Sequence, residues 1–320
     1  MLKFIYYSTF LKYKNNIIVK GEELNIVKKN FFKKIQKQKI NEIEDYVIKS
    51  EIVKKLASMI FQSEIFNYFL KKIDEFRNYK LIEQIKKNPI PKHVAIIMDG
   101  NRRFARELGL SLEKGHKYGK EKIKEILEWC FELKIKNLTL YAFSIENFER
   151  GKNEVSALMN LCKDELELAL KDSRIHNNKI KINIIGNLDS LPEKIKKSAI
   201  YIMKETKNYN NYILNIALAY GGREEIIHAI KNIAKDVKNN NLKINEITTS
   251  KVSSYLYTNG IPDPDLILRT SGEERISNFL LWQLAYSELY FSDVYWPAFR
   301  KRDFLKAIRT FQQRKRRFGK

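Results

Sequence analysis

The sequence predicts an α/β fold, with a mostly parallel central sheet of about six strands flanked by helices. From residue 91 onward, short apolar runs alternate with longer segments of helical periodicity, which is the βαβ rhythm of a parallel sheet. The first run, Val94–Met98, is continuously apolar, as strands covered on both faces are. At 320 residues the chain is also long enough to bury a sizeable core.

The predicted elements follow one another in regular order. Strands are predicted at His93–Met98, Asn137–Phe143, Ile180–Ile185, Tyr212–Leu218 and Leu266–Arg269. Helices are predicted at about Tyr118–Leu133, Glu154–Asn177, after Pro192, at Glu224–Val237 and from Asp303 onward. Because no internal repeat is visible and the crossovers are regular, we assign residues 91–320 to one domain.

The first 90 residues have a different character. Residues 1–50 are rich in Lys, Asn and Ile without periodicity, which is typical of a biased, poorly ordered extension. Residues 51–90 place apolar side chains at three- and four-residue steps, which predicts an N-terminal amphipathic helix or pair of helices. Such a segment either packs against the following domain or lies on a membrane surface, and the pattern is compatible with both.

The formal net charge of +22 would suit nucleic acid or an anionic membrane as a partner. The excess lies at the two ends, however. Residues 1–90 hold 19 basic and 10 acidic residues, and residues 300–320 hold 10 basic residues and one acidic residue. A nucleic-acid binder would instead interleave basic and aromatic residues over one face, so we expect no nucleic-acid partner. Only Cys130 and Cys162 occur, so no disulfide framework is encoded.

A candidate site begins where the first predicted strand ends. The strand runs straight into an acid, a glycine, an amide and two arginines, residues 99–103. The carboxylate of Asp99 can hold Mg²⁺, Gly100 lets backbone N–H groups approach an anion, and Arg102 and Arg103 offer forked donors to phosphate. This grouping suits a diphosphate with a divalent cation. An ordinary Asp-Gly turn is the alternative.

Polar residues also follow later strands. Residues 144–150 offer a hydroxyl, an amide, an aromatic ring and a guanidinium at the same sheet edge. Arg269, Arg275 and Ser277 can converge on one anion, unless this loop merely pairs its arginines with residues 273–274. Glu288 stands alone in an apolar run, where burial requires a metal or an arginine. We expect it to share a cation with Asp99.

Residues 91–319 closely resemble the cis-prenyltransferases, the family of undecaprenyl and dehydrodolichyl diphosphate synthases. Five stretches carry the resemblance, namely residues 93–104, 140–148, 218–223, 268–277 and 278–291. The paired Arg102–Arg103 with residues 208–210 and 256–259 look most like the eukaryotic dolichol-type branch. The resemblance implies repeated condensation of isopentenyl diphosphate onto an allylic primer such as farnesyl diphosphate. The implied product is a long-chain polyprenyl diphosphate with cis double bonds, a precursor of dolichol-type carrier lipids.

The same resemblance implies roles for individual residues. Catalytic roles are implied for Asp99, Arg103, His116 and Asn147, and Mg²⁺ binding for Asp99 and Glu288. The residues implied to hold the allylic diphosphate are Gly100, Asn101, Arg102 and Arg103, and Arg150 is implied to help hold phosphate. Those implied to hold isopentenyl diphosphate are Arg269, Arg275, Ile276 and Ser277. Those implied to wall the hydrocarbon are Phe104 and Phe148, and those implied to orient the reacting groups with Asn147 and His116 are Ser144 and Glu146.

The resemblance also implies a hydrophobic tunnel for the growing chain, lined by the helix predicted at Glu154–Asn177. An ordinary core face would have the same period. One departure concerns Leu112, where relatives commonly carry an arginine that contacts phosphate, and Lys114 is the candidate replacement.

The C-terminal tail bears on assembly. Arg317 and Gly319 match the family's Arg-x-Gly, which reaches across a dimer to the neighbour's isopentenyl diphosphate, so a homodimer is expected. A catalytically silent scaffold subunit of the same family is the rival, but intact Asp99, Arg269, Arg275 and Glu288 argue against it. The basic leader and the lipid product suggest peripheral attachment to the cytosolic face of the endoplasmic reticulum, or another organelle addressed by the extension.

Overall fold

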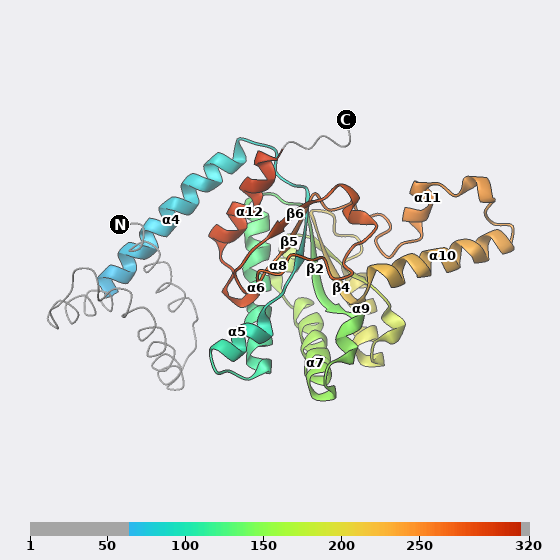
Figure 1. Cartoon of the computed structure of the whole chain (residues 1–320), viewed down its shortest axis with the longest axis horizontal. Coiled ribbons are helices and arrows are strands. Elements are labelled where there is room, and N and C mark those ends of the chain that lie inside the picture. The colour runs from blue at the N-terminus through green and yellow to red at the C-terminus, as the bar shows by residue number, and fades with distance from the viewer. Residues whose placement is uncertain (1–63, 315–320) are drawn as a thin grey trace. The chain divides into compact units, whose positions relative to one another are not determined.

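The computed structural model describes residues 64–314 (Figure 1). The chain divides into two compact units. The larger comprises Ile85–Phe104 and the residues from Ser111 onward, and the smaller holds most of helix α4 (Glu64–Lys86) and residues 105–110. The predicted extension over residues 1–50 and the start of the amphipathic segment lie outside the described residues. Within them, no helix is long and apolar enough to cross a bilayer.

The larger unit is built on a six-stranded sheet of order β3-β4-β2-β1-β5-β6, in which every pair is parallel. The strands are β1 (His93–Ile97), β2 (Asn137–Ser144), β3 (Ile180–Ile185), β4 (Tyr212–Tyr220), β5 (Leu266–Arg269) and β6 (Glu288–Phe291). The predicted fold class is confirmed. Five strands match their predicted positions, and the sixth, β6, arises at the edge from the apolar run around Glu288.

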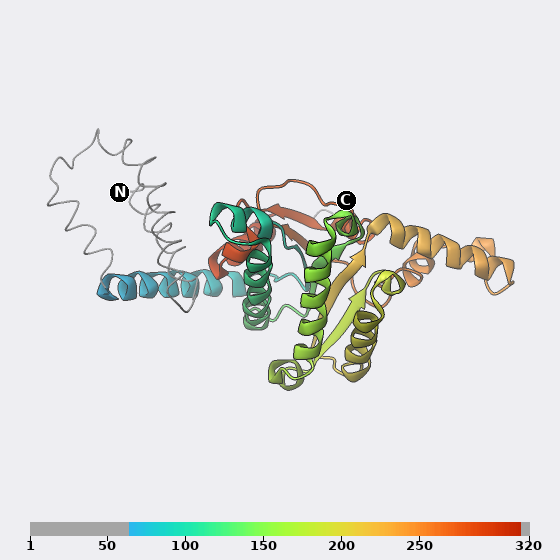
Figure 2. The ribbon, with the colours of Figure 1, turned by 90° about the horizontal axis from the view of Figure 1, so that it is seen from below.

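Helices connect the strands on both faces, as Figure 2 shows from below. They are α5 (Asn101–Glu107), α6 (Leu112–Glu132), α7 (Lys152–Ala169), α8 (Ser173–Asn177), α9 (Glu193–Glu205), α10 (Gly222–Lys238), α11 (Thr249–Ser254) and α12 (Lys301–Gln313). The single helix predicted over residues 154–177 is wrong, because the chain turns after Ala169 and Asp172 caps a new helix by accepting a hydrogen bond from the Arg174 N–H.

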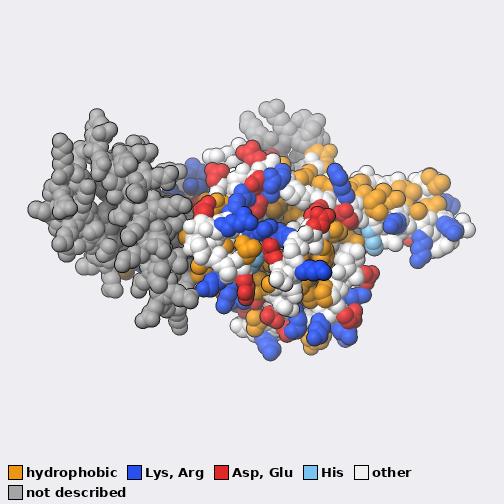
Figure 3. Space-filling model, turned by 60° about the horizontal axis from the view of Figure 1, so that its bottom comes forward, with side chains coloured by type: hydrophobic (Ala, Val, Ile, Leu, Met, Phe, Trp, Pro, Cys, Tyr) orange, Lys and Arg blue, Asp and Glu red, His pale blue; other side chains and the backbone are white. Residues whose placement is uncertain are grey.

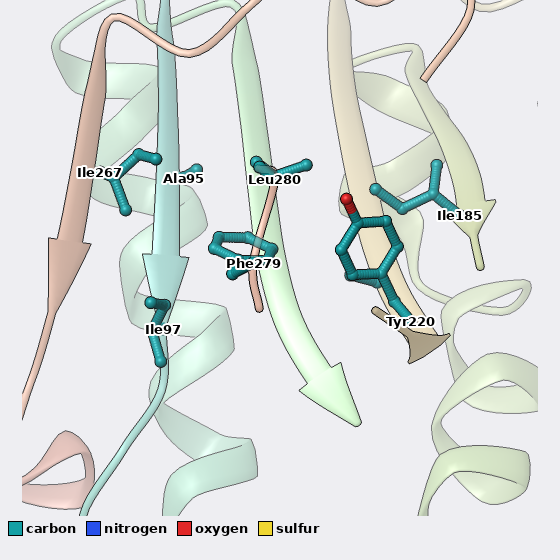
Figure 4. Packing of buried hydrophobic residues seen from close by; sticks show 8 residues of the cluster. Ala95, Ile97, Ile185, Tyr220, Ile267, Phe279 and Leu280 are labelled. Carbon is teal, nitrogen blue, oxygen red and sulfur yellow. The ribbon is translucent and has the colours of Figure 1, made fainter. Parts of the chain in front are cut away.

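The core that packs against the central strands of the sheet is apolar and aromatic (Figure 4). Ala95, Ile97 and Ile267 from the central strands meet Phe279 and Leu280 from the segment that follows β5. Among the other members of this cluster is Tyr220, which lies edge-on to Phe279 with 6.1 Å between ring centroids. This packing ties residues 277–280 to the sheet, so the polar side chains next to them are held in place.

A polar ladder, most of it buried, runs from the amino end of β1 across β2 to the middle of β4 and β3. Asn183 donates to Asn215, Asn215 donates to Thr139 Oγ1, and Thr139 lies 2.7 Å from His93 Nε2. His93 Nδ1 lies 2.6 Å from the Pro262 carbonyl oxygen. Burial lowers the pKa of His93 to about 4, against smaller opposing contributions from Pro262 and Asp265, so the ring is neutral at pH 7. Each of these groups has a partner, which fixes the register of four strands.

Candidate active site

Asp99 follows β1 at the carboxyl edge of the sheet, beside the end of β5. Ile97 of β1 pairs in register with Arg269 of β5, so Asp99 and Arg269 end their strands side by side. From β1 the sheet grows toward β2, β4 and β3 on one side and toward β5 and β6 on the other. Ligands of open α/β sheets bind where the strand order reverses in this way, which makes this edge the candidate site.

The Asp99 carboxylate lies between two guanidinium groups. Its Oδ2 accepts hydrogen bonds from Arg269 Nη2 at 2.8 Å and from Arg103 Nη2 at 3.3 Å. Burial alone would raise the pKa of Asp99, but the hydrogen bond and charge of Arg269, with the charge of Arg103, outweigh it and hold the pKa below its ordinary value. Asp99 is therefore ionised at neutral pH.

Arg269 is the most deeply placed of the cations, with 5% of its side chain exposed. Its Nη1 donates to Ser277 Oγ at 2.8 Å and to the carbonyl oxygen of Arg275. Its Nε is buried without a hydrogen-bond partner among the described residues. Ser277 and Asn278 both have positive φ, at 45° and 60°, a conformation that costs energy for residues other than glycine and that clusters at functional sites.

Arg103 joins this group as well. It donates from Nη2 to Ser271 Oγ at 2.6 Å and from Nη1 to Glu273 Oε1 at 2.6 Å, and the other oxygen of Glu273 pairs with Arg275. The salt-bridge alternative for this loop is thus correct for Glu273, although the loop still brings the arginines together. Arg103 was expected in the allylic cradle, yet it lies with the residues expected to bind isopentenyl diphosphate. Of these, Ile276 is half-buried and Arg275 is exposed.

Gly100 and Asn101 form the backbone segment that lies next to these cations. Gly100 has φ of 105°, and a Cβ there would lie 2.8 Å from the Tyr295 ring and 3.0 Å from Ser271 Cβ, so only glycine fits. Asn101 Nδ2 donates to the Met98 carbonyl oxygen at 3.2 Å, whereas its Oδ1 is buried without a partner among the described residues. The backbone is therefore closely packed where an anion would approach.

A second cationic group surrounds Glu154 in the first turn of α7. Its Oε1 lies 3.1 Å from Arg150 Nη1, 3.5 Å from His116 Nε2 and 3.6 Å from Arg102 Nε. Burial lowers the pKa of His116, an effect that Glu154 opposes and that Arg150 and Arg102 reinforce. The sequence analysis named the three cations but missed Glu154. The signal was present, because Arg150 and Glu154 have the i, i+4 spacing of a helical ion pair.

The residues expected to orient the reacting groups form a turn after β2. Asn147 Oδ1 accepts a hydrogen bond from the Ser144 N–H at 3.2 Å, which holds the 3-10 helix η1 (Ile145–Glu149) against the strand end. Glu146 accepts from Asn278 Nδ2 at 2.9 Å and so links this turn to the loop after β5. Phe148 packs edge-on against Phe143 at 4.9 Å. Asn147 thus has a structural task, while its expected catalytic task stays a prediction.

A cavity of about 570 Å³ opens between α7 and α9 next to this turn. Its apolar lining includes Phe148, Val155, Met159 and Ile195, and its charged lining includes Arg150, Lys152, Lys163, Glu193 and Lys194. Leu158 and Leu166 of the same helix are buried in the core instead. The apolar residues of α7 therefore have two roles, because some line a cavity and others pack in the core. Phe104 is buried and contacts Tyr118 at 6.0 Å.

Lys and Arg side chains gather at the centre of the face shown in Figure 3, with acidic side chains among them.

Residues 97–319 match the family model described as putative undecaprenyl diphosphate synthase. A tritrans,polycis-undecaprenyl-diphosphate synthase (geranylgeranyl-diphosphate specific) of Thermoplasma acidophilum is 55% identical over 240 residues, which are 75% of this chain and 93% of that protein. An enzyme of the same name from Thermococcus kodakarensis is 53% identical over 247 residues, or 77% and 93%.

The chain belongs to the undecaprenyl diphosphate synthase family. Solved structures agree with this assignment. Lavandulyl diphosphate synthase from Lavandula x intermedia, in complex with dimethylallyl diphosphate, superposes with a TM-score of 0.70 at 36% identity and covers 72% of this chain and 99% of its own. A probable undecaprenyl diphosphate synthase from Campylobacter jejuni has a TM-score of 0.59 at 35% identity, covering 73% and 100%. The chain is thus a cis-prenyltransferase, and the named archaeal relatives do not support the predicted dolichol-type branch.

The prediction that Asp99 and Glu288 lie close together within this chain is wrong. Glu288 pairs in register with Leu266, which pairs with Val94, so it begins β6 at the amino end of the strands. Asp99 lies beyond their carboxyl end. The sequence predicted that the charge of a buried Glu288 carboxylate needs a partner. That partner is Arg314, whose Nη1 lies 2.7 Å from Glu288 Oε2. Arg317 and Gly319 of the predicted tail lie outside the described residues.

The residues present fit Mg²⁺ as a cofactor when it is brought with a diphosphate. Mg²⁺ in phosphoryl sites is held by one or two carboxylates together with water and substrate oxygens. Asp99 supplies one ionised, partly exposed carboxylate at the mouth of the site. Within residues 64–314, no three His, Cys, Asp or Glu side chains cluster as a ligand set, so the substrate would complete the coordination.

Proposed function

We propose that this cis-prenyltransferase adds isopentenyl units to geranylgeranyl diphosphate and makes a tritrans,polycis-undecaprenyl diphosphate. The reaction class rests on one observation above all, the convergence of Asp99, Arg103 and Arg269 at the switch point of the sheet. The primer rests on the archaeal relatives, which are named as geranylgeranyl-diphosphate specific and at least 53% identical. Geranylgeranyl diphosphate thus replaces farnesyl diphosphate, the primer first expected.

In the proposed reaction the C–O bond of the allylic diphosphate breaks, a C–C bond forms to isopentenyl diphosphate, and the isopentenyl unit loses a proton. Negative charge grows on the departing diphosphate, so preorganised guanidiniums stabilise the transition state more than the ground state. Arg102 and Arg150 would contact the allylic diphosphate, and Arg269 and Arg275 the isopentenyl diphosphate. Mg²⁺ held by Asp99 would neutralise part of the diphosphate charge.

The cavity between α7 and α9 would receive the start of the growing hydrocarbon. Val155, Met159 and Ile195 offer it apolar surface, and Arg150, which also lines the cavity, belongs to the group around Glu154 that would face the diphosphate. A cavity lined by both apolar and charged side chains suits an amphiphilic substrate.

The homodimer is part of the proposal. Exposed isoleucines line the α10–α11 segment, with Ile227 50%, Ile230 53% and Ile244 76% exposed, and an apolar patch of this kind suits association with a second copy. Sedimentation equilibrium of the purified chain tests this, since a monomer with full activity would contradict it. Peripheral attachment to the endoplasmic reticulum stays a prediction.

The function is tested with the purified chain, radiolabelled isopentenyl diphosphate and Mg²⁺, with geranylgeranyl or farnesyl diphosphate as primer. Chain growth with a preference for geranylgeranyl diphosphate, abolished by EDTA, is the expected result. A preference for farnesyl diphosphate would overturn the primer, and growth unaffected by EDTA would overturn the cofactor. If no primer is elongated, the whole proposal fails.

A further inference from the structure

Arg102 and Arg103 are neighbours in sequence, but they turn to opposite groups of residues. Arg103 contacts Asp99, Ser271 and Glu273. Arg102 instead lies beside Glu154 of α7. Each arginine is thus matched with a different acid, and the acids belong to different elements.

Glu154 is the centre of the second group. A single oxygen, Oε1, faces Arg102 from α5, His116 from α6 and Arg150 from the turn before α7. Only 13% of the Glu154 side chain is exposed, so solvent screens these charges little. The guanidiniums of Arg102 and Arg150 would repel one another this close without an acid between them, so Glu154 is what allows them to converge beside His116.

The group is left short of acceptors. Arg102 Nε and His116 Nε2 are both buried and lie at or beyond the outer limit of a hydrogen bond to Glu154, with no better partner among the described residues. Buried polar atoms are normally paired, so donors left open mark a place for ligand oxygens. A diphosphate would supply several.

We propose that Glu154 is a positioning residue, an internal counter-ion that holds Arg102, Arg150 and His116 together for the allylic diphosphate. It acts on one substrate only, because the arginines expected to bind isopentenyl diphosphate have their own acids in Asp99 and Glu273. The inference rests on the proposed function for the identity of the ligand. The geometry of the counter-ion stands without it.

Replacing Glu154 with glutamine keeps the shape and removes the charge. The two arginines then repel each other and separate, and gathering them again beside His116 opposes binding of the allylic diphosphate. We expect Glu154→Gln to raise KM for geranylgeranyl diphosphate about tenfold or more, with kcat changed less than about threefold, because ground-state and transition-state binding fall together. KM for isopentenyl diphosphate should stay within about twofold of wild type.

Glu154→Asp restores the charge on a shorter side chain and should recover part of the loss. The matched control is Glu149→Gln, the same change at an exposed glutamate for which no ion pair is found among the described residues, and it should leave both KM values unchanged. Equal KM values for Glu154→Gln and wild type, or equal losses for both substrates, would overturn the inference.

Calorimetry supplies a readout that needs no turnover, because neither substrate condenses alone. Geranylgeranyl diphosphate should bind Glu154→Gln about tenfold more weakly than wild type, and isopentenyl diphosphate equally well. If wild type makes no product, the proposed function fails, yet this binding comparison still decides the role of Glu154. If Glu154→Gln does not fold, Glu154→Ala, which also removes the charge, is measured in its place, and wild-type affinity for both diphosphates in that variant would count against the counter-ion.

Discussion

The buried polar groups near the two ends of the same sheet differ in charge and in hydrogen-bond pairing. At the amino end, the ladder of His93, Thr139 and Asn215 is neutral and fully paired. At the carboxyl end, the group includes charged arginines, and Asn101 Oδ1, Arg102 Nε, His116 Nε2 and Arg269 Nε are left without hydrogen-bond partners among the described residues. Asn137 Oδ1, at the first residue of β2, is likewise buried without a partner among the described residues, so the contrast is between the paired ladder and the group around Arg102, His116 and Arg269. Mutations at the two ends should therefore affect different properties.

The largest effect is expected from Asp99→Ala at the carboxyl end. Removing this acid leaves Arg269 and Arg103 without their shared partner and removes the expected cation ligand. We expect kcat to fall about 1,000-fold, roughly 4 kcal/mol of barrier, with the fold preserved. Labelled product formation measures the first effect and urea unfolding the second. Asp263→Ala, at an exposed acid on the amino end, is the control, and turnover as slow as that of Asp99→Ala would break the comparison.

Arg269→Lys keeps the charge but removes the planar fork that reaches Asp99 and Ser277 at once. Since lysine is a point charge with different geometry, we expect kcat/KM for isopentenyl diphosphate to fall about 100-fold, or roughly 3 kcal/mol. Steady-state kinetics with each substrate varied in turn measures this. An unchanged kcat/KM would show that charge alone is enough at this position.

His93 makes the amino end sensitive to pH. Its pKa is about 4 in the folded protein, because burial lowers it, against about 6.5 in an unfolded chain. As pH falls, the unfolded state takes up the proton first, so this contribution is complete above about pH 6.5 and is lost as pH falls toward 4.

His93→Gln should flatten the dependence of the free energy of unfolding on pH across this window, by roughly 2–3 kcal/mol in total. Urea unfolding at several pH values measures it. His228→Gln, at an exposed histidine, is the control. If the free energy of unfolding of His93→Gln depends on pH as that of wild type does, His93 is not neutral in the folded protein.

The smallest effect is expected from Thr139→Val, which removes the central link of the ladder. The free energy of unfolding should fall by about 1–2 kcal/mol, because His93 and Asn215 both lose a partner. Both KM values and kcat should remain those of wild type. Loss of activity without loss of stability would contradict the division between the two ends of the sheet.

Much of the fold followed from the sequence because apolar runs of four to nine residues have few other structures. The strand at Ile180–Ile185 begins and ends where predicted. The edge strand β6 was missed because Glu288 begins it and only three apolar residues follow, so the run was interpreted as the surroundings of a buried acid and not as a strand. The break after Ala169 was missed because Asp172 caps α8 within an otherwise helical pattern.

For the site, residues at strand ends were predictable and the pairing of charges was not. Asp99 and Arg269 both end central parallel strands, and parallel strands bring such residues together. Glu288 was misplaced because its position depends on the register of β6, which no local pattern reveals. Glu154 was missed because a glutamate in the first turn of a helix is ordinary, and only the folded chain shows which cations face it.

Arg102 and Arg103 occupy consecutive positions at the start of α5, about 3.8 Å apart along the backbone and rotated by about 100° around the helix axis. In the proposed reaction, one dipeptide therefore reaches toward both reactants. The spacing of the two phosphorylated heads would then be set by covalent geometry, which thermal motion hardly changes. Inserting one residue between these arginines would spoil the alignment of donor and acceptor carbons even if every contact to each separate substrate survived.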